Sequence, residues 1–148
     1  MKKYASVLLA AFVLTTGLFT AEAAPADSGL SLSCASCLLM EKETGAILLE
    51  ENSHEKLEPA SVTKIMTLLL VMEAVDSGRI SLDDPVTVSA YAAGMGGSQV
   101  YLKEGEQMPV SEMIKCVTVV SGNDCSVALA EHLAGSESAF VAQMNQRA

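Results

Sequence analysis

The sequence contains no tryptophan, few aromatic residues (4%) and few basic ones, since 9 Lys and Arg stand against 18 Asp and Glu in 148 residues. Proteins that bind a nucleic-acid backbone need clustered Lys and Arg, so a net charge of −9 excludes that class of partner. Charged residues make up 18% of the chain and apolar residues 50%, which excludes disorder along its whole length. The two histidines, His54 and His132, have no second ligand at metal spacing, so we expect no bound metal. The composition is typical of one globular domain or of part of one.

Cysteines are few, and their spacing leaves several interpretations open. Cys34 and Cys37 form a Cys-x-x-Cys pair, which fits a redox pair or half of a zinc site, but a zinc site needs a second pair at short spacing. Cys116 and Cys125 each lie in an apolar helical pattern, where a free cysteine behaves as a small buried apolar residue. Disulfide pairing is the alternative, because the segment described next predicts export to a compartment where disulfides form.

The first 23 residues have the pattern of a secretory signal peptide. Lys2 and Lys3 are followed by an uncharged apolar run over residues 7–18, and Ala21-Glu22-Ala23 offers a signal-peptidase site. A retained membrane anchor is the alternative, but the run is shorter than the roughly 20 apolar residues that span a bilayer. No later run is long and apolar enough to span one. We expect an exported, extracytoplasmic protein, with a flexible lead-in over residues 24–33.

Apolar periodicity then predicts a β-hairpin followed by helices. Two short apolar runs, 34–41 and 46–51, flank a turn that contains Gly45, as in a hairpin. Residues 61–77 have helical spacing of apolar side chains, and Gly78 ends that helix. The later elements are a strand at 86–88, a short helix after an N-cap at Ser89, an irregular hairpin over 101–108, a helix from an N-cap at Ser111 to about Val120, a helix over 124–133 and a helix from Ser136.

The last predicted helix reaches Ala148 without a stop signal. Two strands of a hairpin cannot bury both of their faces by themselves. We therefore expect an amino-terminal part of a longer protein, with the remaining strands of the sheet beyond residue 148.

A Ser-x-x-Lys pattern occurs at Ser53–Lys56 and again at Ser61–Lys64. The first lies in a charged stretch, whereas Ser61 follows Pro59 at the start of the apolar helix over 61–77. A spacing of three places Ser61 and Lys64 on one helical face, with Cβ atoms about 5–6 Å apart. The helix amino terminus favours a developing anion, and desolvation favours a neutral amine that can take the serine proton. An ordinary N-cap serine with an exposed lysine is the alternative.

A second polar motif, Ser121-Gly122-Asn123, interrupts two apolar helices. Nothing structural requires a hydroxyl and a carboxamide at that point. Directed inward, they would add a second proton-transfer group and an amide that orients a peptide. A simple Gly-Asn helix stop is the alternative.

Ser-x-x-Lys followed about sixty residues later by Ser-x-Asn is part of the signature of penicillin-binding proteins and serine β-lactamases. Over roughly residues 35–148 the chain resembles the low-molecular-mass penicillin-binding proteins, the serine D-alanyl-D-alanine carboxypeptidases. The third motif of that family, Lys-Thr-Gly on a strand, is absent from the sequence. The matching segments are Pro59-Ala60-Ser61-Val62-Thr63-Lys64-Ile65-Met66-Thr67, Gly96-Gly97-Ser98-Gln99, Glu104-Gly105-Glu106, Ser121-Gly122-Asn123-Asp124 and Ala128-Leu129-Ala130-Glu131.

The resemblance implies an α+β fold like that of penicillin-binding proteins and serine β-lactamases, in which a helical cluster lies beside an antiparallel sheet flanked by helices; here that fold is incomplete. Residues 34–148 would form the amino-terminal part of its catalytic domain. Ser61 would be the acylated nucleophile, Lys64 its base, Ser121 the relay to the leaving D-alanine and Asn123 the residue that binds the substrate amide. The backbone N–H of Ser61 would be one oxyanion donor. No cofactor is implied.

The implied substrate is a peptidoglycan stem peptide that ends in D-Ala-D-Ala, and β-lactams would be covalent inhibitors. A region beyond residue 148 would provide peripheral membrane attachment, and residues 1–148 alone are expected to be inactive. Two other interpretations stay open. One is a β-lactamase or transpeptidase of the same superfamily, and the other is a non-catalytic wall-binding or penicillin-binding fragment.

Overall fold

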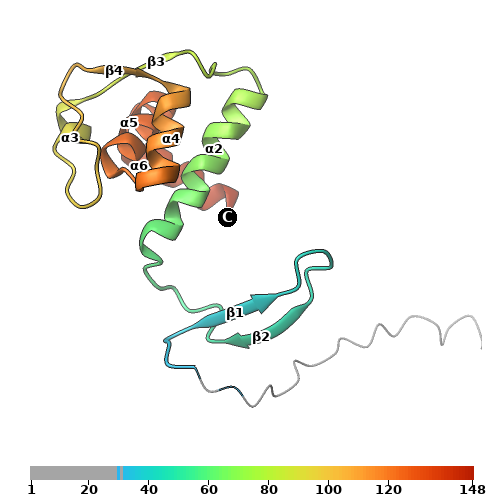
Figure 1. The fold of residues 1–148 in the computed structure, drawn as a ribbon. Helices are drawn as coiled ribbons and strands as arrows, with labels where there is room; N and C mark the ends of the chain where they lie inside the picture. Colours follow the sequence, from blue (N-terminus) through green and yellow to red (C-terminus); the bar gives the residue numbers. More distant parts are fainter. Residues whose placement is uncertain (1–29, 31) are drawn as a thin grey trace, which may run out of the picture. The chain divides into compact units, whose positions relative to one another are not determined.

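The computed structural model describes residue 30 and residues 32–148, and they fall into two units that divide after Leu57 (Figure 1). The expected signal peptide lies outside the described residues. So does the expected lead-in, except for residues 30, 32 and 33. Each unit is described separately below.

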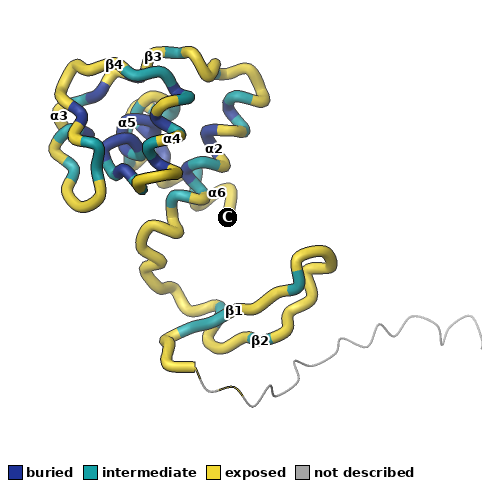
Figure 2. The backbone as a smooth tube through the Cα atoms, viewed as in Figure 1, coloured by how far each residue is buried: buried dark blue, intermediate teal, exposed yellow. Residues whose placement is uncertain are grey.

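The first unit is built around a β-hairpin, as the sequence predicts. Strand β1 (Cys37–Met40) pairs antiparallel with β2 (Ile47–Glu51), with a bulge between Leu39 and Met40. The Glu41 carboxylate accepts hydrogen bonds from the backbone N–H groups of Glu43 and Thr44, and these bonds lower the pKa of Glu41. The apolar side chains of both strands are about half exposed, so the hairpin does not bury its own faces (Figure 2).

The second unit, residues 58–148, is mainly helical. Helix α5 (Asn123–Ala134) contacts α4 (Val110–Val120), α6 (Glu137–Arg147), α2 (Lys64–Asp76) and the short α3 (Ala90–Ala93). A small antiparallel sheet joins β3 (Pro85–Thr87) to β4 (Gln107–Pro109). A 3-10 helix, η1 (Ala60–Thr63), precedes α2.

Helix α5 supplies the centre of the core. Val127, Ala128, Leu129 and Ala130 are all buried, as expected for a helix that other elements surround (Figure 2). One cluster joins α5 to α4 and β3, and a second, smaller cluster forms around Phe140 of α6. The first turn of α5, which begins at Asn123, is therefore held by buried neighbours.

Two sequence predictions for residues 101–120 are wrong. Residues 101–108 do not form a hairpin of their own, because Met108 of β4 pairs with Val86 of β3. Ser111 does not cap α4; the N-cap residue is Pro109, and the backbone N–H groups of Val110 and Ser111 donate to loop carbonyls. Backbone acceptors thus replace a side-chain cap. The predicted N-cap at Ser89 is confirmed, and the helix predicted to start near Ser136 begins at Glu137, with Ser136 as its N-cap.

All four cysteines are free thiols, among which Cys125 is buried, Cys116 and Cys37 are half-buried and Cys34 is exposed. Within the described residues, no cluster of three or more His, Cys, Asp or Glu side chains is suited to a metal ion. No helix in the same part of the chain is long and apolar enough to cross a membrane.

Candidate active site

The Ser61 segment differs from the sequence prediction in the type of helix. Ser61 lies in the 3-10 helix η1, and the α-helix begins only at Lys64. Ala60, just before it, has a φ of +48°, a left-handed conformation that is rare for residues other than glycine. Ser61 and Lys64 still meet as predicted, because Lys64 Nζ donates to Ser61 Oγ at 3.2 Å. A spacing of three brings side chains together in a 3-10 helix as well.

The Lys64 side chain is half-buried and makes a second contact, in which Nζ donates to Asn123 Oδ1 at 2.6 Å. No salt bridge to Lys64 occurs in the described part of the chain. A lysine amine without its charge has a lone pair that can accept a serine proton, so the contact between Lys64 and Ser61 is suited to general-base catalysis.

The expected burial of the helix start is not found in the described residues. No residue of η1 is buried, and Ile65 is 68% exposed. Further along α2, the described chain buries Thr67, Leu70, Val71 and Ala74. A pocket of about 310 Å³ opens beside Lys64, lined also by Asn123 and by side chains of α5 and α6.

Ser121 reaches Ser61 from the end of α4. It is the C-cap residue of that helix, with a φ of 58° and a ψ of 40°. Its Oγ donates to Ser61 Oγ at 2.9 Å. Three side chains from two motifs about sixty residues apart are thus in one hydrogen-bonded group, Lys64–Ser61–Ser121, and Asn123 extends it through Lys64.

Asn123 is held by residues 96–102, which begin with the matching segment Gly96-Gly97-Ser98-Gln99 but include none of the predicted site residues. Its Nδ2 donates to the Gly96 carbonyl at 2.7 Å, and its backbone N–H donates to the Ser98 carbonyl at 2.7 Å. Gly97 has a φ of +76°, and a Cβ atom there would lie 2.9 Å from Asn123 Nδ2. A side chain at position 97 would therefore displace the carboxamide.

The two residues that follow Asn123 in the chain, Asp124 and Cys125, are both fully buried. Burial raises the pKa of the Cys125 thiol, and the neighbouring Asp124 carboxylate and Cys116 thiol add to this effect. The Asp124 carboxylate accepts backbone N–H groups from residues 100, 102 and 125. The sequence signal for Asp124 was its place at the end of the matching segment Ser121-Gly122-Asn123-Asp124.

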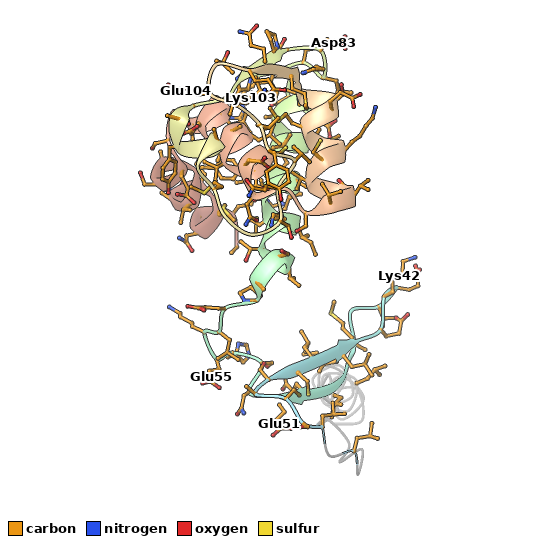
Figure 3. All side chains as sticks on the ribbon, turned by 60° about the vertical axis from the view of Figure 1, so that its left-hand side comes forward. Lys42, Glu51, Glu55, Asp83, Lys103 and Glu104 are labelled. Carbon is orange, nitrogen blue, oxygen red and sulfur yellow. The ribbon has the colours of Figure 1, made fainter. Side chains whose placement is uncertain are left out.

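The other Ser-x-x-Lys pattern forms no comparable group. Ser53 Oγ donates to the Glu50 carboxylate at 2.9 Å. The neighbouring side chains Glu51 and Glu55 are exposed (Figure 3). A hydroxyl that already donates to a carboxylate in a solvated segment is not activated by a lysine.

The sequence pattern of the peptidase S11 family, D-alanyl-D-alanine carboxypeptidase, matches residues 20–148. The chain is 47% identical over 151 residues to the D-alanyl-D-alanine carboxypeptidase DacF of Bacillus subtilis (strain 168), covering 100% of this chain and 39% of that protein. It is 40% identical over 156 residues to the D-alanyl-D-alanine carboxypeptidase DacC of Escherichia coli (strain K12), with 98% and 39% covered. The chain thus spans about two fifths of the length of these relatives.

Solved structures give the same result for the fold. The D-alanyl-D-alanine carboxypeptidase DacD from Francisella tularensis superposes with a TM-score of 0.75 at 38% identity, over 80% of this chain and 29% of that one. Penicillin binding protein 6B from Escherichia coli gives a TM-score of 0.72 at 40% identity, over 80% and 39%. The fold class predicted from the sequence is confirmed, and the chain belongs to the D-alanyl-D-alanine carboxypeptidase family.

Proposed function

We propose that the complete protein is a serine-type D-Ala-D-Ala carboxypeptidase that removes the terminal D-alanine from peptidoglycan stem peptides. The observation that carries this proposal is the contact of Ser61 Oγ with both Lys64 Nζ, at 3.2 Å, and Ser121 Oγ, at 2.9 Å. A nucleophile between a base and a second hydroxyl is the geometry that acyl transfer needs. Membership of the family supports the choice of substrate.

In the proposed acylation step, Ser61 Oγ attacks the carbonyl carbon between the two D-alanine residues. Its proton passes to Lys64 Nζ as the new C–O bond forms. The tetrahedral intermediate then loses the terminal D-alanine, whose nitrogen receives a proton through Ser121 Oγ. The C–N bond breaks and an ester remains on Ser61. The Ser61 N–H would stabilise the oxyanion as one of its donors.

In the proposed deacylation step, water hydrolyses the ester and Ser61 regains its proton. Asn123 would bind the peptide amide of the acyl chain during both steps. Its Oδ1 and Nδ2 already have partners in Lys64 and Gly96, and a carboxamide can make about four hydrogen bonds, so capacity is left for a substrate. A β-lactam would acylate Ser61 by the same attack, with its ring amide in place of the D-Ala-D-Ala bond.

The proposed place of action is outside the cytoplasm, because the stem peptides of peptidoglycan are there. The signal-peptide pattern of residues 1–23 supports export. Peripheral attachment to the membrane through a region beyond residue 148 belongs to the same proposal.

Mass spectrometry after incubation with penicillin tests the proposal. We expect the complete protein to gain one penicillin on the peptide that contains Ser61 and to release D-alanine from a peptide ending in D-Ala-D-Ala. Ser61→Ala should abolish both. Ser53→Ala is the matched control, because it removes the serine of the other Ser-x-x-Lys pattern, and it should leave both unchanged.

The same experiment separates the alternatives. A penicillin ester hydrolysed within seconds would indicate a β-lactamase, and transfer of the acyl group to a second peptide would indicate a transpeptidase. A stable ester without D-alanine release would indicate a non-catalytic penicillin-binding protein. D-alanine release that survives Ser61→Ala would refute the mechanism.

A further inference from the structure

We propose that Asp124 is a positioning residue for the reaction, which keeps residues 96–102 in place so that the Asn123 side chain stays on Lys64. This inference rests on the proposed function of Ser61 and Lys64. It assigns a task to a buried acidic residue that takes no part in the proton transfers described above.

Asp124 is completely buried, and its carboxylate accepts hydrogen bonds from three backbone N–H groups. Oδ2 accepts from Val100 at 3.0 Å and from Leu102 at 3.2 Å. Oδ1 accepts from Cys125 at 2.9 Å, within the first turn of α5. The carboxylate therefore ties one end of the segment 96–102 to the start of α5. Hydrogen bonds to a charged acceptor are stronger than those between neutral groups.

The other end of the same segment holds Asn123. The Gly96 carbonyl accepts from Asn123 Nδ2 at 2.7 Å, and the Ser98 carbonyl accepts from the Asn123 backbone at 2.7 Å. With Nδ2 engaged in this way, Oδ1 is directed to Lys64 Nζ at 2.6 Å. A continuous set of contacts thus runs from Asp124 through the segment to Asn123 and Lys64.

Loss of the carboxylate would remove the acceptor of the Val100 and Leu102 N–H groups. The segment 96–102, whose other end carries the Gly96 carbonyl, would then no longer be tied to the start of α5. The Asn123 carboxamide would then be free to turn away from Lys64. Misplacing a catalytic contact by about 1 Å can reduce a rate by about a hundredfold. We therefore expect an effect on rate as well as on stability.

A purely structural role for Asp124 is the competing explanation, since an acidic residue in the first turn also stabilises a helix. Such a role would reduce the amount of folded enzyme and leave the rate of each folded molecule unchanged. The effect of removing the Asp124 carboxylate would then also be the same with and without the Asn123 side chain. The experiment has to measure both properties.

The test uses Asp124→Asn in the complete protein, in the wild-type and the Asn123→Ala backgrounds. The asparagine keeps the size of the side chain but turns one acceptor oxygen into an NH2 group that faces backbone N–H groups. Labelling with a fluorescent penicillin to saturation gives the number of protein molecules that can be acylated. The acylation rate is then divided by this number. We expect Asp124→Asn to slow acylation about tenfold or more in the wild-type background and less than about threefold in the Asn123→Ala background.

Asp84→Asn is the matched control, because the Asp84 carboxylate also accepts a backbone N–H, that of Ser81, but in a turn outside the segment 96–102. It should leave the rate for each site unchanged. If too little Asp124→Asn protein folds for titration, Asp124→Ser keeps one acceptor oxygen and gives the same comparison.

Equal slowing in both backgrounds, or a normal rate for each titrated site, would overturn the positioning role. A wild-type protein that forms no adduct on Ser61 would instead overturn the proposed function, and this inference with it. The two failures are therefore distinguishable.

Discussion

Replacing Gly97 with alanine tests how closely the segment 96–102 fits Asn123. Gly97 has a φ of +76°, and a Cβ atom there would lie 2.9 Å from Asn123 Nδ2. Gly105 is a matched control in the same loop region, because its φ is +77° and a Cβ atom there would meet nothing within 4 Å. Both alanine variants must adopt a left-handed backbone conformation that alanine disfavours, and only the alanine at position 97 would contact the Asn123 carboxamide.

The structure allows the expected magnitudes to be worked out. A left-handed conformation costs an L-residue about 1–2 kcal/mol, so both variants should lose stability of that order. In Gly97→Ala the Asn123 carboxamide must also move, which breaks its hydrogen bond to Gly96 or to Lys64. A lost hydrogen bond costs about 0.5–1.5 kcal/mol. We expect Gly97→Ala to be less stable than Gly105→Ala by roughly that amount and to acylate about tenfold or more slowly.

Urea denaturation gives the two stabilities, and the rate of labelling by a fluorescent penicillin gives the acylation rate of each folded variant. Gly105→Ala should acylate like the wild type. Equal acylation rates in the two variants would show that the carboxamide position does not matter for the reaction, and the reasoning about Asn123 would fail.

Two further predictions concern residues beside the site. Because burial raises the pKa of Cys125 above its ordinary value of 9.0, the folded protein keeps this proton at pH values where the unfolded chain loses it, so stability falls as pH rises through 9. The difference in free energy of unfolding between wild type and Cys125→Ala should therefore decline between pH 8 and pH 10, by at most about 1.4 kcal/mol per pH unit. A difference that stays constant over this pH range would contradict the prediction. Ser121 has a φ of 58°, a conformation that glycine adopts freely. The free energy of unfolding of Ser121→Gly should therefore exceed that of Ser121→Ala by about 1 kcal/mol. Both variants should lose D-alanine release to the same extent, and a more stable alanine variant would disprove the strain.

The elements with strong local signals were predictable from the sequence. The hairpin has its turn glycine, and the helices after Ser89 and Ser136 have serine N-caps whose side chains accept an N–H three residues on. The contact between Ser61 and Lys64 follows from a spacing of three. Local chemistry decides each of these features.

Features decided by distant neighbours were not predictable. The start of α4 is capped by carbonyls of residues 82 and 84, and β4 pairs with a strand about twenty residues earlier. Asp124 is buried by the segment 96–102, and only that contact distinguishes it from an ordinary acidic residue in a first helical turn. Gly97 lies in a segment that matches the family, but the approach of Asn123 to it is a tertiary contact that the sequence pattern does not specify.

The hydrogen bonds from Lys64 to Asn123 and from Ser121 to Ser61 join residues 59 and 60 positions apart in the chain. Contacts of this sequence separation close a long loop, and the entropy lost on closing it opposes their formation in a chain that is not yet ordered. A nascent or partly unfolded chain therefore carries a serine that meets only its local lysine. Full reactivity would arise together with the native tertiary structure, so penicillin labelling during refolding would report the last stage of folding.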